Sequence, residues 1–224
     1  MSATPSFVMA RDVAARAEQN APLTSRLRIN LNLKVGLYLL LSGIFCVVYF
    51  GIERLRGLQP RTLPLSYVDR AISFHPAAIY PYQSVFVLIP LFPFLTTTRE
   101  DLFRFVKGFV PLCAVCFLTF LIFPVFGPRP ENLEANRLMQ MLFSFDKNLN
   151  AFPSLHAGLA AYSVLFGFHI ARGNQKLRWL AMVGALWAGI ILVATMATKQ
   201  HYFVDLPPAI CLAWLANRWA WVRA

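Results

Sequence analysis

The chain has 224 residues, of which 58% are hydrophobic and only 14% are charged, and its formal net charge is +11. Average soluble domains are about half apolar and about a quarter charged, so this composition indicates a membrane protein. A nucleic-acid-binding protein gathers its Lys and Arg on one face, whereas here they are scattered over short loops between apolar runs. The length suits one domain, and the charge is better explained as loop charge that orients membrane helices.

Six apolar runs follow a polar N-terminal segment of residues 1–33. Each run approaches the roughly 20 residues that a helix needs to cross a bilayer. They cover residues 34–52, 79–98, 102–126, 154–171, 179–198 and 203–222. A backbone in lipid must satisfy its own hydrogen bonds, so these runs are expected to be helices. The sequence therefore predicts an all-α fold, a six-helix transmembrane bundle over residues 34–224. The small residues in the fourth and fifth runs place those two helices in the interior of the bundle.

The loop charges predict an orientation. Six crossings put both termini on one side of the membrane, and that side carries more Lys and Arg than the opposite side. The positive-inside rule then makes both termini, including residues 1–33, cytoplasmic. We expect a multi-pass protein of the cell membrane whose loops 53–78 and 127–152 face outward.

Polar residues gather where the apolar runs reach this outer face. In chain order they are Arg129, Ser154, His156, Lys199, His201 and Asp205. Arginine, lysine, histidine and aspartate are costly near lipid, and their presence there is by default a functional hypothesis. The orientation therefore predicts an active site at the extracytoplasmic face.

These residue types suit phosphoryl transfer. Arg129 and Lys199 can supply positive charge to phosphate oxygens, and Ser154 with the free N–H groups of a helix start can supply donors. A nucleophilic imidazole needs an acceptor behind it, which Asp205 can provide for His201 if the intervening turn is helical. A second histidine can protonate the leaving oxygen. Simpler roles stand beside these, because Ser154 can be only a helix cap and both cations can merely reach the lipid headgroups.

Three motifs carry a family resemblance. They are Gly-Pro-Arg-Pro at residues 127–130, Pro-Ser-Leu-His at 153–156 and Lys-Gln-His-Tyr-Phe-Val-Asp at 199–205. In this order they resemble the motifs of the type 2 phosphatidic acid phosphatase superfamily. The resemblance implies that His201 is the nucleophile that becomes phosphohistidine, that Asp205 orients it and that His156 is the general acid. It also implies that Arg129 and Lys199 hold the phosphate.

Some positions depart from the usual motifs. Ile122 stands where the first motif usually has Lys, Leu155 replaces a Gly in the second, and Ala194 and Thr195 replace Ser-Arg before the third. This pattern resembles the divergent branch that includes inositol phosphorylceramide synthases. The resemblance leaves open a lipid phosphate phosphatase and, as the alternative, a phosphotransferase that moves a phospho-headgroup to a lipid hydroxyl. A transporter or scaffold on the same fold is a third, non-enzymatic possibility.

The expected partners follow from this interpretation. The substrate is a lipid phosphate or a phospholipid that approaches from the bilayer, and no nucleic acid is expected. No cofactor is expected either, because no carboxylate cluster suits Mg²⁺ and the two motif histidines lack a third metal ligand. The sequence leaves the oligomeric state open.

Overall fold

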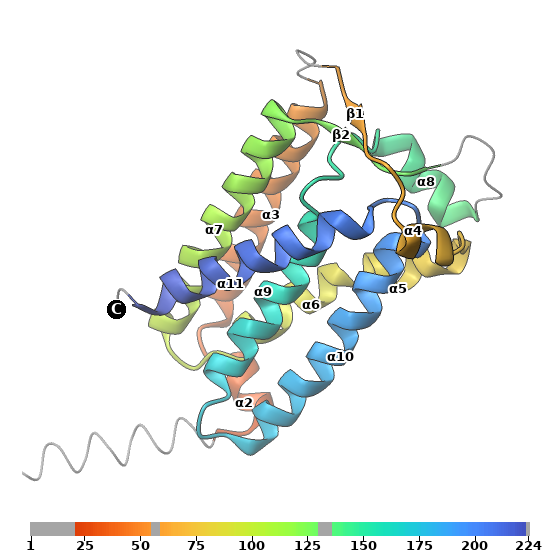
Figure 1. The fold of residues 1–224 in the computed structure, drawn as a ribbon. Coiled ribbons are helices and arrows are strands. Elements are labelled where there is room, and N and C mark those ends of the chain that lie inside the picture. Colours follow the sequence, from red (N-terminus) through yellow and green to blue (C-terminus); the bar gives the residue numbers. More distant parts are fainter. Residues whose placement is uncertain (1–20, 55–58, 130–135, 223–224) are drawn as a thin grey trace, which may run out of the picture.

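The computed structural model describes residues 21–54, 59–129 and 136–222. Most of the predicted cytoplasmic segment, residues 1–20, lies outside these ranges. Most of the described chain is helical, and its two strands form one short parallel pair (Figure 1). The longer helices are α3 (Leu31–Arg54), α6 (Val85–Phe94), α7 (Arg99–Ile122), α9 (Leu155–Ile170), α10 (Gln175–Ala197) and α11 (Leu206–Val222). The shorter elements are α2 (Leu23–Arg28), β1 (Arg61–Thr62), α4 (Tyr67–Ala71), the 3₁₀-helix η1 (Pro76–Ala78), α5 (Ile79–Gln83), β2 (Val125–Phe126), α8 (Arg137–Phe145) and the 3₁₀-helix η2 (Phe203–Asp205).

A helix forms in each of the six apolar runs, which confirms the all-α prediction. Four helical stretches are long and apolar enough to cross a membrane: Leu31–Arg54, Pro76–Phe94, Arg99–Ile122 and Gln175–Ala197. The protein is therefore a membrane protein. Helices α9 and α11 have 16 and 17 residues, short of the roughly 20 that a perpendicular crossing needs. The count of six crossings and the side of the termini remain predictions.

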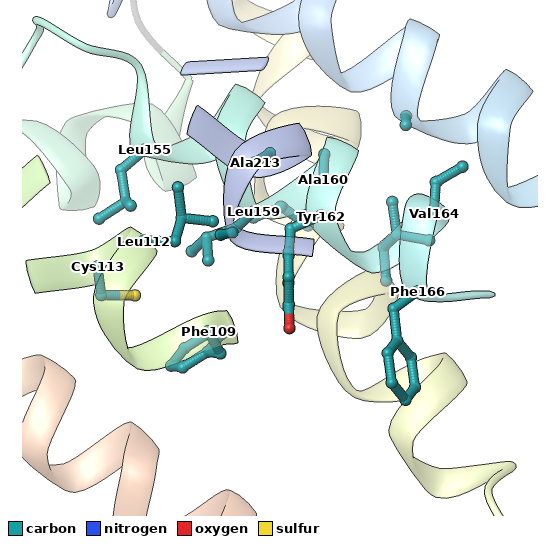
Figure 2. Packing of buried hydrophobic residues seen from close by; sticks show 14 of the residues in the cluster. Phe109, Leu112, Cys113, Leu155, Leu159, Ala160, Tyr162, Val164, Phe166 and Ala213 are labelled. Carbon is teal, nitrogen blue, oxygen red and sulfur yellow. The ribbon is translucent and has the colours of Figure 1, made fainter. Parts of the chain in front are cut away.

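Helix α9 forms the centre of the bundle and packs against α6, α7, α10 and α11 (Figure 1). Figure 2 shows Leu159 of α9 beside Phe109 and Leu112 of α7, with Ala213 of α11 close by. Lipid tails are as apolar as these side chains, so close van der Waals packing is what holds such helices together. The interior position predicted for α9 is confirmed.

Glycine permits one especially close approach. A Cβ atom on Gly167 of α9 would lie 2.7 Å from the ring of Phe92 in α6, and one on Gly184 of α10 would lie 3.0 Å from it. The ring of Phe92 therefore packs directly against the backbones of both α9 and α10. The interior prediction for α10 holds only for this face, because Gly189 is exposed and meets no neighbouring atom within 4 Å.

Candidate active site

The turn that carries His201 fixes the proton on its imidazole ring. The Nδ1 atom lies 2.8 Å from the main-chain oxygen of Ala151 and 3.6 Å from Oδ2 of Asp205. A carbonyl oxygen can only accept, so Nδ1 carries the hydrogen and Nε2 keeps its lone pair. The predicted acceptor was Asp205, but at 3.6 Å the carboxylate is too distant for a hydrogen bond. Ala151, which the sequence did not indicate, holds the tautomer instead.

Asp205 lies within ion-pair distance of His201, with its Oδ2 atom 3.6 Å from Nδ1. It is fully buried, and its Oδ2 accepts a hydrogen bond from Tyr202 N at 2.7 Å. Residues 203–205 form the 3₁₀-helix η2 instead of the α-helical turn that the four-residue spacing assumed. The main-chain oxygen of Asp205 also accepts from Ser154 N at 3.1 Å, which ties η2 to the start of α9. A negative charge at this distance would stabilise a positively charged imidazole ring on His201.

His156 lies in the first turn of α9 and is held by aromatic contacts. Its ring stacks on Tyr82 at a centroid distance of 4.0 Å, and Phe86 meets it edge-on at 6.0 Å. The centroids of His156 and His201 are 6.0 Å apart, so one phosphoryl group can contact both rings. Nε2 of His156 is buried and finds no hydrogen-bond partner among the described residues. A ring with an uncommitted nitrogen suits proton transfer.

Arg129 follows β2 and reaches towards the same turn. Its Nη2 donates a hydrogen bond to Oε1 of Gln200 at 2.8 Å, and its guanidinium lies 3.8 Å from the ring centroid of Phe143. Burial lowers the pKa of Arg129, while the negative charge of Asp146 opposes this shift. The Nε–H is buried with no partner in the described parts of the chain. Arg129 therefore has a donor and a charge available for a phosphate.

Lys199 occupies a different environment from the predicted one. Its Nζ donates hydrogen bonds to the main-chain oxygens of Asp69, at 3.0 Å, and Ile72, at the end of α4. Burial lowers the pKa of Lys199, and Asp69 opposes this effect. Two of the three Nζ donors are thus directed to carbonyls at the end of a short helix, and a phosphate contact by Lys199 stays a prediction.

Ser154 has the simpler of its two predicted roles. It is fully buried and forms the N-cap of α9, where its Oγ accepts from Ala157 N at 3.3 Å. This contact is the usual one for a serine at a helix start. A direct contact between Ser154 and phosphate stays a prediction.

Asp69 links α4, in the loop between α3 and α5, to the turn that carries His201, a contact that the sequence analysis did not predict. Its Oδ1 accepts from Phe203 N at 2.7 Å, and its Oδ2 accepts from the Ser66 hydroxyl at 2.6 Å. With Lys199 bound to its carbonyl, Asp69 contacts the chain on both sides of His201, at Lys199 and at Phe203 of η2. The capping-box pattern of Ser66 and Asp69 could have predicted the start of α4 from the sequence. It could not have predicted the contact of Asp69 with Phe203, which lies far away in the chain.

Gly127 lets the first motif approach the third. Its N–H donates to Asn148 O at 3.0 Å, and a Cβ atom here would lie 2.4 Å from the main-chain oxygen of Gln200. Beside it, Val125 of β2 bonds residues 149 and 151. This packing brings the segments that carry Arg129, Ala151 and His201 next to one another.

The chain was also compared with models of known protein families. A sequence model described as the PAP2 superfamily matches residues 50–219, which include all three motifs. Searches of curated proteins and of solved structures found no match. Because the family match covers well over half of the chain, the protein belongs to the PAP2 superfamily.

Proposed function

We propose that the protein hydrolyses a lipid phosphomonoester through a phosphohistidine on His201. The observation that carries this proposal is the setting of the His201 ring. Its Nδ1–H is bonded to Ala151 O at 2.8 Å, the Asp205 carboxylate is 3.6 Å away, and the ring of His156 is its neighbour. Membership of the PAP2 superfamily, which suggests phosphohydrolase-type chemistry, supports the same assignment.

The reaction then has two steps. In the first, Nε2 of His201 attacks phosphorus while His156 protonates the departing lipid oxygen, and Arg129 balances the charge on the phosphate oxygens. In the second, His156, now neutral, takes a proton from water as water attacks the phosphohistidine. The P–N bond breaks, phosphate leaves and both histidines return to their initial states.

Lipid phosphotransfer is the second candidate function. A hydroxyl acceptor would replace water in the second step and form a new phosphodiester. The feature that favours it is a cavity of about 760 Å³ beside Arg129, which is much larger than water requires.

The proposal includes the placement in the membrane. Residues 34–224 would form one six-crossing domain of the cell membrane, with residues 1–33 and the C-terminus in the cytoplasm and the site at the extracytoplasmic face. Reporter fusions at Ala224 test this orientation, and an outward C-terminus would reverse the side of the site.

Purified protein in micelles provides the direct test of activity. It should be offered a panel of lipid phosphomonoesters and phosphodiesters, and both free phosphate and new lipid products should be followed. We expect free phosphate from a monoester in the presence of EDTA, because Arg129 supplies the charge. Activity that EDTA abolishes and Mg²⁺ restores would contradict the mechanism.

A further inference from the structure

Helix α8 lies across the ends of two helical stretches that are long enough to span the membrane (Figure 1). Its N-cap residue, Asn136, donates a side-chain hydrogen bond at 2.9 Å to the main-chain oxygen of Pro76, the first residue of one stretch. Met139 is fully buried in a cluster with Ala194, which lies near the end of the other stretch, at Ala197. Spanning helices enter and leave the bilayer at their ends, so these contacts put α8 at the level of the membrane surface.

The side chains of α8 divide into three faces around the helix. The inner face packs towards the bundle and carries Met139, Leu142 and Phe143. A polar face is exposed and carries Arg137, Gln140 and Ser144. Between these two faces, the apolar side chains of Met141 and Phe145 are 57% and 62% exposed. Their four-residue spacing puts them on the same side of the helix, so α8 has one apolar face that the bundle does not cover.

Lipid is the neighbour that suits this uncovered face. A helix that rests on a membrane turns its polar side chains to water and its apolar side chains to the boundary between headgroups and acyl chains. The two stretches that carry α8 also expose apolar side chains near the same ends, Tyr80 at 63% and Val193 at 53%. Exposed apolar side chains on a membrane-spanning stretch face lipid, so the bilayer reaches the rim on which α8 lies.

We propose that α8 lies in the headgroup layer of the bilayer, with Met141 and Phe145 inserted towards the acyl chains and with Arg137 and Ser144 in water. A second copy of the chain is a poorer partner for this face. A stable dimer buries about 800 Å² on each partner, far more than two side chains expose. An interfacial helix needs only its own apolar side chains to enter the lipid.

The inner face of α8 contacts the candidate site. The ring centroid of Phe143 lies 3.8 Å from the guanidinium of Arg129. Met139 shares its cluster with Tyr82, whose ring stacks on His156. A helix is about 10 Å across, so these contacts hold the site within about one helix diameter of the lipid headgroups. The placement of α8 therefore sets the depth at which a lipid phosphate meets the site, and this part of the inference rests on the proposed function.

Spin labels measure the placement directly, on the full chain in phosphatidylcholine nanodiscs that hold one copy each. A nitroxide is attached after Met141→Cys, Phe145→Cys or Ser144→Cys, in a background where Cys46→Ala and Cys211→Ala leave only the buried cysteines. Relaxation of each label by oxygen, which concentrates in lipid, is compared with relaxation by a water-soluble nickel chelate. We expect the labels at positions 141 and 145 to respond mainly to oxygen and the label at position 144 to respond mainly to nickel.

Three other results would overturn the placement. A strong nickel response at all three positions would show that the apolar face lies in water. Labels at positions 141 and 145 that are shielded from both reagents would show that protein covers this face. A dominant oxygen response at all three positions would put the whole helix below the headgroups, which contradicts a polar face in water.

Turnover tests whether this placement sets the depth of the site. Met141→Asp puts a charge on the apolar face and should draw α8 towards water, so the KM for phosphatidic acid in vesicles should rise about three- to tenfold. The kcat/KM for soluble nitrophenyl phosphate should stay at the wild-type value. Ser144→Asp is the matched control, because it adds the same charge to the exposed polar face of the same helix, and its KM should not change.

The two experiments fail separately. An unchanged KM in Met141→Asp would overturn the role of α8 in setting the depth of the site, and equal losses on both substrates would assign the effect to distortion of the site instead. A wild-type protein that turns over neither substrate would overturn the proposed function, whereas the spin labels would still decide where α8 lies.

Discussion

The turn around His201 and the first turn of α9 hold their histidines in different ways. His201 is fixed by a hydrogen bond from Nδ1–H to Ala151 O and by the nearby charge of Asp205. His156 has no such acceptor in the described chain and is held by the faces and edges of Tyr82 and Phe86. A nucleophile profits from a fixed tautomer and a charge that stabilises its cation, whereas a general acid needs a proton and freedom to deliver it. The contrast supports His201 as nucleophile and His156 as acid.

Replacing the nucleophile should have the largest effect. His201→Ala removes the atom that is proposed to bond to phosphorus, so turnover should fall by roughly 10⁴-fold or more on every substrate. Acid-labile radioactive phosphate should be trapped on the wild type and be absent from the variant. Labelled phosphate on the His201→Ala protein would reverse the assignment of the two histidines.

Loss of the proposed acid should depend on the leaving group. His156→Ala should cost about 10²- to 10⁴-fold on a lipid phosphate, the usual range for general acid catalysis. An activated substrate such as nitrophenyl phosphate leaves without a proton, so the loss there should be less than about tenfold. Initial rates of both hydrolyses measure the difference. Equal losses on the two substrates would remove the acid role from His156.

Substitutions of Arg129 and Lys199 should affect different quantities, because the two side chains have different contacts. Loss of Arg129 should lower kcat, and loss of Lys199 should mainly lower stability. Arg129→Ala should reduce kcat by about 10²- to 10³-fold, a typical cost for a group that stabilises developing charge. Lys199→Ala leaves the two carbonyls of α4 without a donor, so it should destabilise the fold by about 1–3 kcal/mol. It should reduce kcat by no more than about tenfold, which is less than the loss in Arg129→Ala. Thermal unfolding and kinetics of both variants provide the comparison. A larger loss of kcat in Lys199→Ala, with unchanged stability, would restore its predicted phosphate role.

The smallest effect should come from the stacking partner of His156. Tyr82→Leu removes an aromatic contact worth about 0.5–1.5 kcal/mol, so turnover of a lipid phosphate should fall about two- to tenfold. The same substitution in a His156→Ala background should have little further effect, because the contact is already lost. Tyr80→Leu is the matched control, since Tyr80 is exposed. Additive losses in the double variant would show that Tyr82 acts independently of His156.

The sequence by itself determined the class of fold and the positions of the longer helices, and it predicted a set of residues for the site. Long apolar runs can only be helices in lipid, and the three motifs are short, local patterns that need no tertiary information. The family match over residues 50–219 bears out the resemblance that those motifs carried.

The tertiary structure decided which contacts those residues make. Ala151 supplies only a backbone carbonyl to His201, and every residue has one, so no side-chain pattern could reveal it. Lys199 looked free in the sequence because its partners, the carbonyls near Asp69, lie about 130 positions away. The cavity lined by Glu53 and Asp146 likewise joins α3 to a loop some 90 residues later. Contacts between distant segments depend on how helices pack, and local sequence patterns do not record that packing.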